Sequence, residues 1–175
     1  MITPLSRLAK FFKKNKLDAV LISSHSNIVY LTNYSGFSKE EREAYLFITD
    51  NKQYILTDGR YSQAVKTLIA DFKLIEISPK LSAMDVLKKL VKKHKIKKLG
   101  FEGHNLTHLE YKRLSKNIKN MSHVSLASLR IIKTSKEISL INKACRLGDK
   151  AFDYVLKKIK LGVSEKELAF EIEFF

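Results

Sequence analysis

The sequence predicts an α/β fold in which a mixed β-sheet is flanked by helices. Short β-rich apolar runs alternate with amphipathic helical patterns, and one β-hairpin interrupts that alternation. Alternation favours parallel strands, and the hairpin adds an antiparallel pair, so the sheet is expected to be mixed. Near Ser128 the pattern becomes wholly helical. We therefore expect an α/β domain over residues 1–127, then a linker and the first helices of a second domain over residues 128–175.

An amphipathic helix is expected at the N-terminus. Leu5, Leu8, Phe11 and Phe12 share one helical face, with lysines on the other. Pro4 stands in the first turn, where its missing N–H costs little.

The rest of the first domain is assigned from apolar runs, turn residues and capping signals. Asp50-Asn51 supply the turn of the hairpin, Ser82 and Asp85 give a weak cap, and Thr107 and Glu110 form a capping box. The predicted elements are a strand at 17–22, a short helix or packed turn at 27–31, a loop at 35–43, hairpin strands at 44–48 and 53–56, a helix at 60–68, strands at 72–77 and 98–101, helices after Ser82 and Thr107, and a strand containing Val124 and Leu126.

A long amphipathic helix opens the second part. Thr134 and Glu137 form a capping box, and apolar residues then recur at spacings of three and four as far as Ile159. Gly162 can end this helix, and a further helix starts at Ser164. Its apolar face still runs at Phe175, so we expect the chain to be a fragment of a longer protein.

The formal net charge is +15, and 27 of the 33 basic residues are lysine. Arginine is the preferred partner of phosphates and bases, so this composition favours a solvated lysine-rich surface over a nucleic-acid-binding domain. No apolar run approaches a membrane span, and lysines occupy the place of a signal-peptide core. Cys145 has no partner for an internal disulfide. We expect a cytoplasmic protein with no membrane partner.

Two groups resemble reactive sites, and each has a simpler interpretation. Glu102, His104 and His108 are close enough in sequence to meet at one metal, but a surface loop with incidental histidines is favoured. Cys145 lies on the apolar face of the long helix, where a small buried thiol is favoured over a nucleophile.

Aromatic residues and one arginine are the other candidates for a site. Tyr30 is expected in the core, while Tyr34 and Phe37 enter a loop and are equally suited to a pocket or to packing. Arg60 could bind a carboxylate or phosphate, although an ion pair with Asp58 or a loop carboxylate is favoured.

Four segments resemble the creatinase/prolidase/aminopeptidase P family, and their order covers nearly the whole chain. Asn33 departs from the glycine that usually follows Leu-Thr in the family, although asparagine tolerates a left-handed backbone. The four segments are Asn27-Ile-Val-Tyr30-Leu31-Thr32, Thr57-Asp58-Gly59-Arg60-Tyr61, Gly100-Phe-Glu102, and Arg130-Ile-Ile-Lys133 with Glu137-Ile138. The last segment is the most specific, and it is similar to the junction that opens the family's catalytic domain.

The resemblance implies a creatinase/prolidase N-terminal domain followed by the start of a "pita-bread" catalytic domain. It implies a metal-dependent Xaa-Pro aminopeptidase or dipeptidase that cleaves peptides with proline at the second position, and a homodimer. Its two divalent ions, taken to be manganese, would be held beyond Phe175, so no metal or catalytic residue is assigned here and the fragment is expected to be inactive. By the same analogy Tyr34, Arg42 and Arg60 would lie near substrate.

Two other functions remain open. Some relatives of this family have lost their metal ligands and bind proteins, so a non-catalytic interaction module is one alternative. A basic nucleic-acid-binding domain is the other, and only the net charge favours it.

Overall fold

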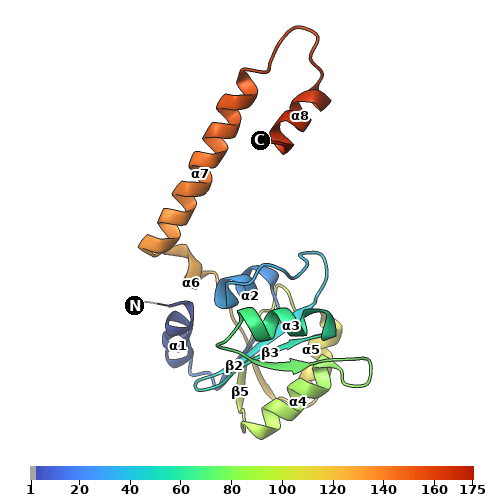
Figure 1. Cartoon of the computed structure of the whole chain (residues 1–175). Coiled ribbons are helices and arrows are strands. Elements are labelled where there is room, and N and C mark those ends of the chain that lie inside the picture. The colour runs from blue at the N-terminus through green and yellow to red at the C-terminus, as the bar shows by residue number, and fades with distance from the viewer. Residues whose placement is uncertain (1–2) are drawn as a thin grey trace. The chain divides into compact units, whose positions relative to one another are not determined.

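The computed structural model describes residues 3–175, which separate into two compact units, one through Arg130 and one from Ile131 to Phe175. Strands occur only in the first unit of the described chain (Figure 1). They are β1 (Ala19–Ile22), β2 (Ala44–Thr49), β3 (Gln53–Thr57), β4 (Lys73–Glu76), β5 (Lys98–Phe101) and β6 (Asn120–His123). The helices are α1 (Pro4–Asn15), α2 (His25–Thr32), α3 (Gly59–Leu68), α4 (Ala83–Lys93), α5 (His108–Ser115), α6 (Ser128–Ile131), α7 (Ser135–Leu156) and α8 (Glu165–Glu173).

The six strands form one sheet in the order β4-β3-β2-β1-β5-β6. Strand β2 pairs antiparallel with both β1 and β3, and the other pairs are parallel. Among the described strands, β2 is therefore the one that runs against the rest. The predicted mixed sheet flanked by helices is confirmed.

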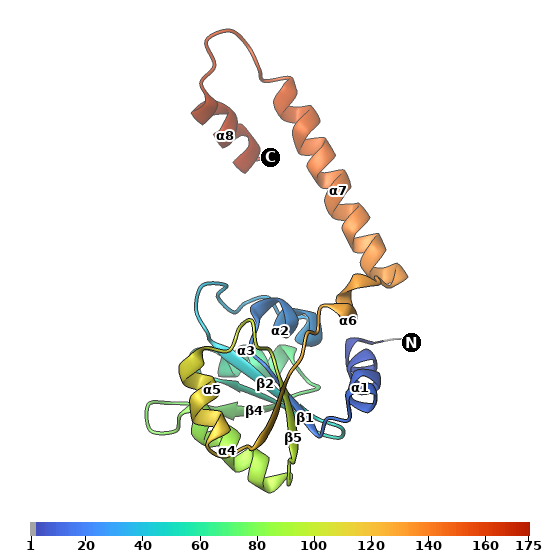
Figure 2. The same ribbon diagram turned by 180° about the vertical axis from the view of Figure 1, so that it is seen from behind.

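Helices cover both faces of this sheet (Figure 2). One face packs on α1, α2 and α3, through residues such as Leu8, Ile28 and Val65. The other face packs on α4 and α5, through residues such as Leu87 and Leu114. Central strands β1 and β2 are buried along their whole length. Apolar side chains on both of their faces explain the continuous runs in the sequence.

Local signals fix several element ends. Asn33 ends α2 in the left-handed conformation, with φ 55° and ψ 26°, so the asparagine keeps the turn that was expected of a glycine. At Gly100 in β5, a Cβ would lie 2.9 Å from Leu17 Cδ1, so a larger residue would require this side chain to shift.

One prediction in the first unit needs correction, and one open alternative is resolved. The last strand is Asn120–His123, which ends before Val124 and Leu126; these two residues instead pack in the core. The segment at 27–31, left open between helix and turn, is helical as part of α2.

The backbone carbonyl of Leu129, near the end of the first unit, is hydrogen-bonded to two earlier helices. That oxygen accepts hydrogen bonds from Arg7 Nη1 at 2.7 Å and from the Tyr30 hydroxyl at 3.0 Å. The predicted packing role of Tyr30 agrees with its contact with the α1–α3 core.

The second unit consists of α7, α8 and their connection. Its helices begin with capping boxes at Thr134, where one was predicted, and at Ser164, where a helix start was predicted. Cys145 is exposed, so the expectation of a buried thiol is wrong for the described chain. Apart from Val155, no residue of α7 is buried, because the described residues do not cover its apolar side. Among residues 3–175, no helix combines the length and the apolar character that a bilayer crossing needs.

Candidate functional site

Polar side chains gather at one edge of the sheet. Strands β1, β3, β4, β5 and β6 run in the same direction and β2 runs against them, so their C-terminal ends meet the N-terminal end of β2. Ligands of open α/β sheets bind at the carboxyl ends of strands. The predicted residues Tyr34, Arg42 and Arg60 lie in segments that border this edge.

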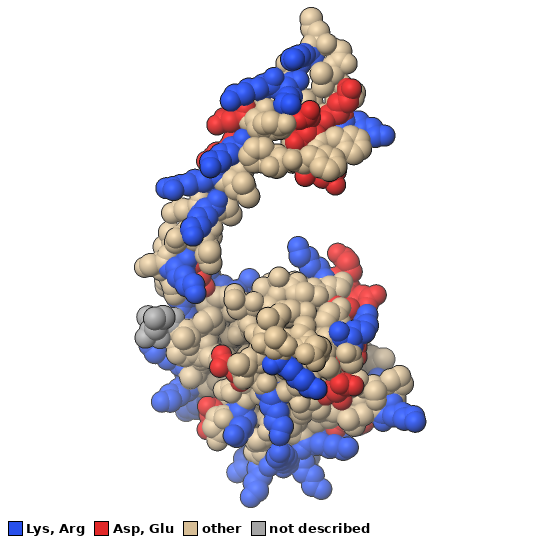
Figure 3. Space-filling model, viewed as in Figure 1, with Lys and Arg blue, Asp and Glu red and all other residues tan. Residues whose placement is uncertain are grey.

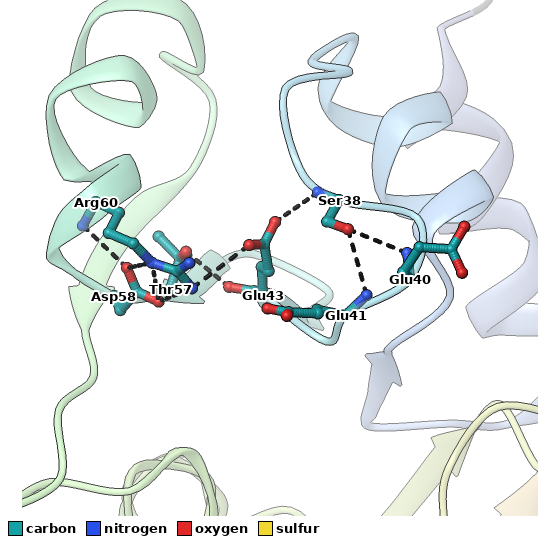
Figure 4. Close-up of polar contacts among 7 residues, drawn as sticks. All are labelled: Ser38, Glu40, Glu41, Glu43, Thr57, Asp58 and Arg60. Carbon is teal, nitrogen blue, oxygen red and sulfur yellow. Dashed lines mark hydrogen bonds and ion pairs between the residues drawn. The ribbon is translucent and has the colours of Figure 1, made fainter.

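Asp58 and Arg60 form a fork at the start of α3. The Asp58 carboxylate caps the helix by accepting from the backbone N–H of Arg60 at 2.9 Å. The same carboxylate accepts from Arg60 Nε at 3.1 Å and Nη2 at 2.8 Å (Figure 4). The favoured Asp58–Arg60 ion pair is thus confirmed. The Arg60 side chain remains 62% exposed.

A buried carboxylate lies behind this fork. The Glu43 side chain is only 4% exposed, and its Oε1 lies 3.4 Å from Arg60 Nη2. Its Oε2 accepts from the backbone N–H of Ser38 at 2.5 Å, while its carbonyl accepts from Thr57 Oγ1 at 2.7 Å (Figure 4). Glu43 therefore ties the loop before β2 to the end of β3. Sequence reasoning missed this role; the available signal was a glutamate placed directly before a buried strand.

Tyr61 completes the surroundings of Glu43. The hydrogen bond from the Tyr61 hydroxyl, followed by the one from the Ser38 amide, lowers the pKa of Glu43 despite its burial, and Arg60 adds to the effect. The bond to Glu43 is also the main reason that the pKa of Tyr61 rises to about 12. Both groups therefore keep one protonation state through the neutral range.

An aromatic row adjoins the fork. The ring of Phe37 lies 4.9 Å from that of Tyr34 and 4.9 Å from that of Tyr61, and the Arg60 guanidinium lies 5.3 Å from the Tyr61 ring. Phe37 is buried in the core, so packing is its role. Tyr34 is half-buried on the same side of the sheet as Arg60.

Arg42 belongs to a different environment. Its Nη2 donates to the Asn105 carbonyl at 2.5 Å, and its Nε lies 3.4 Å from the Glu110 carboxylate of α5. Its guanidinium also lies over the ring of Tyr45, which packs on the α4 and α5 side. Arg42 is 22% exposed and is used inside the fold. The three predicted residues therefore do not form one constellation, because only Tyr34 and Arg60 share a side.

Glu102 has a structural role instead of a metal-binding one. Its carboxylate accepts from the backbone N–H groups of Ser23 at 2.6 Å and Ser24 at 2.8 Å, and from the side chain of Asn27. These bonds fix the start of α2 at the end of β5. Glu102 is buried, so its assignment to a surface loop was wrong, although His104 and His108 are exposed. Within residues 3–175, no three His, Cys, Asp or Glu side chains are placed to hold a metal ion.

Comparison with known proteins gives the family. The model of the creatinase/prolidase N-terminal domain matches residues 4–132. The chain belongs to the creatinase/prolidase family.

Relatives in this family match both units of the chain. The uncharacterized peptidase YqhT of Bacillus subtilis is 31% identical over 98% of this chain, which corresponds to 48% of the relative. The Xaa-Pro dipeptidase from Bacillus anthracis matches with a TM-score of 0.82 and 28% identity, over 98% of this chain and 47% of that one. The chain thus spans about half the length of these relatives.

A solved chain that is shorter than these relatives matches about three quarters of this chain. The Xaa-Pro aminopeptidase structure from Streptococcus thermophilus covers 73% of this chain and 96% of its own length, with a TM-score of 0.63 and 27% identity.

The buried Glu43 should make this creatinase/prolidase domain acid-sensitive. Its folded-state pKa is lowered, so its stabilisation is complete above the ordinary value of 4.5 and disappears as the pH falls through the lower folded-state value. Urea unfolding of the wild type between neutral pH and acid should show a loss of stability below 4.5. The Glu43→Gln variant should be less stable at neutral pH and lose less on acidification. An equal loss of unfolding free energy on acidification in both proteins would contradict this assignment.

Proposed function

We propose that the full-length protein is a metal-dependent Xaa-Pro aminopeptidase or dipeptidase that hydrolyses peptide bonds preceding proline. The observation that carries this proposal is the match with the Xaa-Pro dipeptidase from Bacillus anthracis, which extends over both units at a TM-score of 0.82. The 175 residues correspond to the first half of such an enzyme, and the second unit to the linker and opening helices of its catalytic domain.

The metal site belongs to another part of the full-length protein. The described residues do not fit a metal centre. Their best candidate is Glu102, and its carboxylate already accepts hydrogen bonds from the backbone at the start of α2. Two divalent ions, manganese in our proposal, would activate water for attack on the peptide carbonyl. We expect this chain alone to be inactive.

The first unit serves substrate enclosure and oligomerisation in our proposal. The exposed Arg60 has Nη1 left to donate to a substrate carboxylate, because its Nε and Nη2 donate to Asp58 and hold the guanidinium in place. Tyr34 flanks the same side, whereas Arg42 contributes by holding the loop before β2. We place the protein in the cytoplasm as a homodimer acting on peptides with proline at the second position.

Hydrolysis of proline peptides tests this proposal directly. Full-length protein loaded with manganese should release the residue before proline from Xaa-Pro substrates, and leave Ala-Ala peptides intact. Chelation should lower the rate by at least about a hundredfold, and added manganese should restore it. The 175-residue chain should give no turnover under the same conditions.

Two results would overturn it. Turnover by the pure 175-residue chain would place the chemistry within residues that we consider inactive. A folded, metal-loaded full-length protein without activity on any proline peptide would favour the non-catalytic interaction module.

A further inference from the structure

The basic charge of the first unit is concentrated at the edge opposite the candidate site. Residues 88–119 contain eleven Lys or Arg and only two acidic residues, Glu102 and Glu110. Both acidic residues follow β5, at the other edge, and are already hydrogen-bonded. Figure 3 shows the resulting group of basic side chains at the lower end of the first unit, where Figure 1 places α4. Composition alone did not reveal this clustering.

A groove runs through this basic region. It has a volume of about 560 Å³, and α4, the turn after it and the turn after α5 provide its walls. Two apolar residues, Val91 and Ile96, form part of its lining. The polar lining residues are Lys88, Lys89, Lys92, Lys95 and Asn117.

These lysines are largely free to bind an external anion. Lys88 and Asp85 form an ion pair at 3.4 Å, with both side chains exposed. Among the described residues, Lys92 and Lys95 have no acidic partner and no side-chain hydrogen bond. The carbonyl end of α4 favours cations in its last turn, where Lys92 and Lys93 lie. It does not account for Lys89, or for Lys95 beyond the helix.

We propose that the α4 groove binds the phosphate backbone of duplex nucleic acid without reading its sequence. The groove lining contains no arginine, which would read base edges, and no aromatic residue, which would stack on unpaired bases. Lys88 and Lys92 stand one helical turn apart, about 6 Å along the axis. A duplex presents about one phosphate charge every 1.7 Å, so several phosphates lie within reach of the groove.

An anionic membrane is a poorer fit to this surface. A helix that lies in a bilayer needs an exposed apolar face. The apolar residues of α4, including Met84, Leu87 and Leu90, are buried against the sheet. The groove therefore has positive charge but no exposed apolar face that could insert into a bilayer. This proposal is independent of the proposed peptidase activity.

Fluorescence anisotropy with two unrelated labelled duplexes of about 20 base pairs tests the groove. One variant removes three charges in it: Lys89→Gln, Lys92→Gln and Lys95→Asn, the last because residue 95 has φ 52° and asparagine tolerates that conformation. The matched control removes three exposed charges of the second unit: Lys143→Gln, Lys150→Gln and Lys157→Gln.

The wild type should bind both duplexes equally well. The groove variant should bind at least about tenfold more weakly, and its plot of log affinity against log salt should be shallower by about 2.7, or 0.9 for each phosphate contact. The control variant should stay within about twofold of wild type. Equal losses in both variants, or no binding by the wild type, would overturn the proposal. Tighter binding to phosphatidylserine vesicles or to polyglutamate than to duplex would also overturn it.

Discussion

Replacing Glu102 with alanine is expected to lower the free energy of unfolding of the first unit by about 3 kcal/mol. The carboxylate accepts from two backbone N–H groups, Ser23 and Ser24, and from two side chains, at a buried position. Alanine would leave these donors without an acceptor, and each unsatisfied buried donor costs about 1–3 kcal/mol. The start of α2 would also lose its link to β5.

Urea unfolding followed by far-UV circular dichroism measures this loss. Glu102→Gln keeps one acceptor oxygen and should give an intermediate loss, because its amide group faces donors. Glu40→Ala removes an exposed carboxylate from the loop before β2 and should change stability by less than about 0.5 kcal/mol. If Glu102→Ala costs no more than Glu40→Ala, the carboxylate is not what fixes α2.

Replacing Arg60 with alanine in the full-length enzyme should raise KM by about tenfold or more and leave kcat nearly unchanged. A charge-assisted hydrogen bond contributes about 1.5–3 kcal/mol, and about 1.4 kcal/mol corresponds to a factor of ten. Arg60 is exposed, and its fork with Asp58 fixes its direction. Its loss should weaken ground-state and transition-state binding alike, which appears in KM.

Controls separate recognition from bulk charge. Arg60→Lys keeps the charge but loses the planar guanidinium, so its KM should lie between the values of the wild type and of Arg60→Ala. Lys66→Ala removes another exposed cation of α3 and should leave KM at the wild-type value. Unchanged kinetics in Arg60→Ala would remove Arg60 from substrate binding. Arg42→Ala is a weaker test, since Arg42 holds Asn105 and Glu110 and its loss would disturb the fold.

The sequence allowed most of the fold to be predicted because its signals are local. Buried strands β1, β2 and β3 appear as continuous apolar runs, and capping residues such as Thr107 mark helix starts. The edge strand β6 was missed because its residues Asn120–His123 are exposed or half-buried and carry no apolar alternation. Because Val124 and Leu126 are apolar, the last strand was predicted a few residues later in the chain than it lies.

The candidate site was predictable only where its partners are neighbours in sequence. Asp58 and Arg60 are two residues apart, so their ion pair could be anticipated. Arg42 and Asn105 are separated by 63 positions, and Ser23 and Glu102 by 79. Such contacts depend on strand order, which residue patterns do not specify. The exposure of Cys145 was missed for a related reason, because helical periodicity shows that a face is apolar but not what covers it.

The reversed direction of β2 has a consequence for how this architecture can diversify. In an all-parallel sheet, the segment leading into a strand would arrive at the far edge, away from Asp58 and Glu102. Because β2 enters from the near edge, residues 33–43 form an additional rim there, and a change in their number need not alter any strand pairing. Evolution can therefore rebuild this rim to suit a new ligand while the sheet beneath it stays the same.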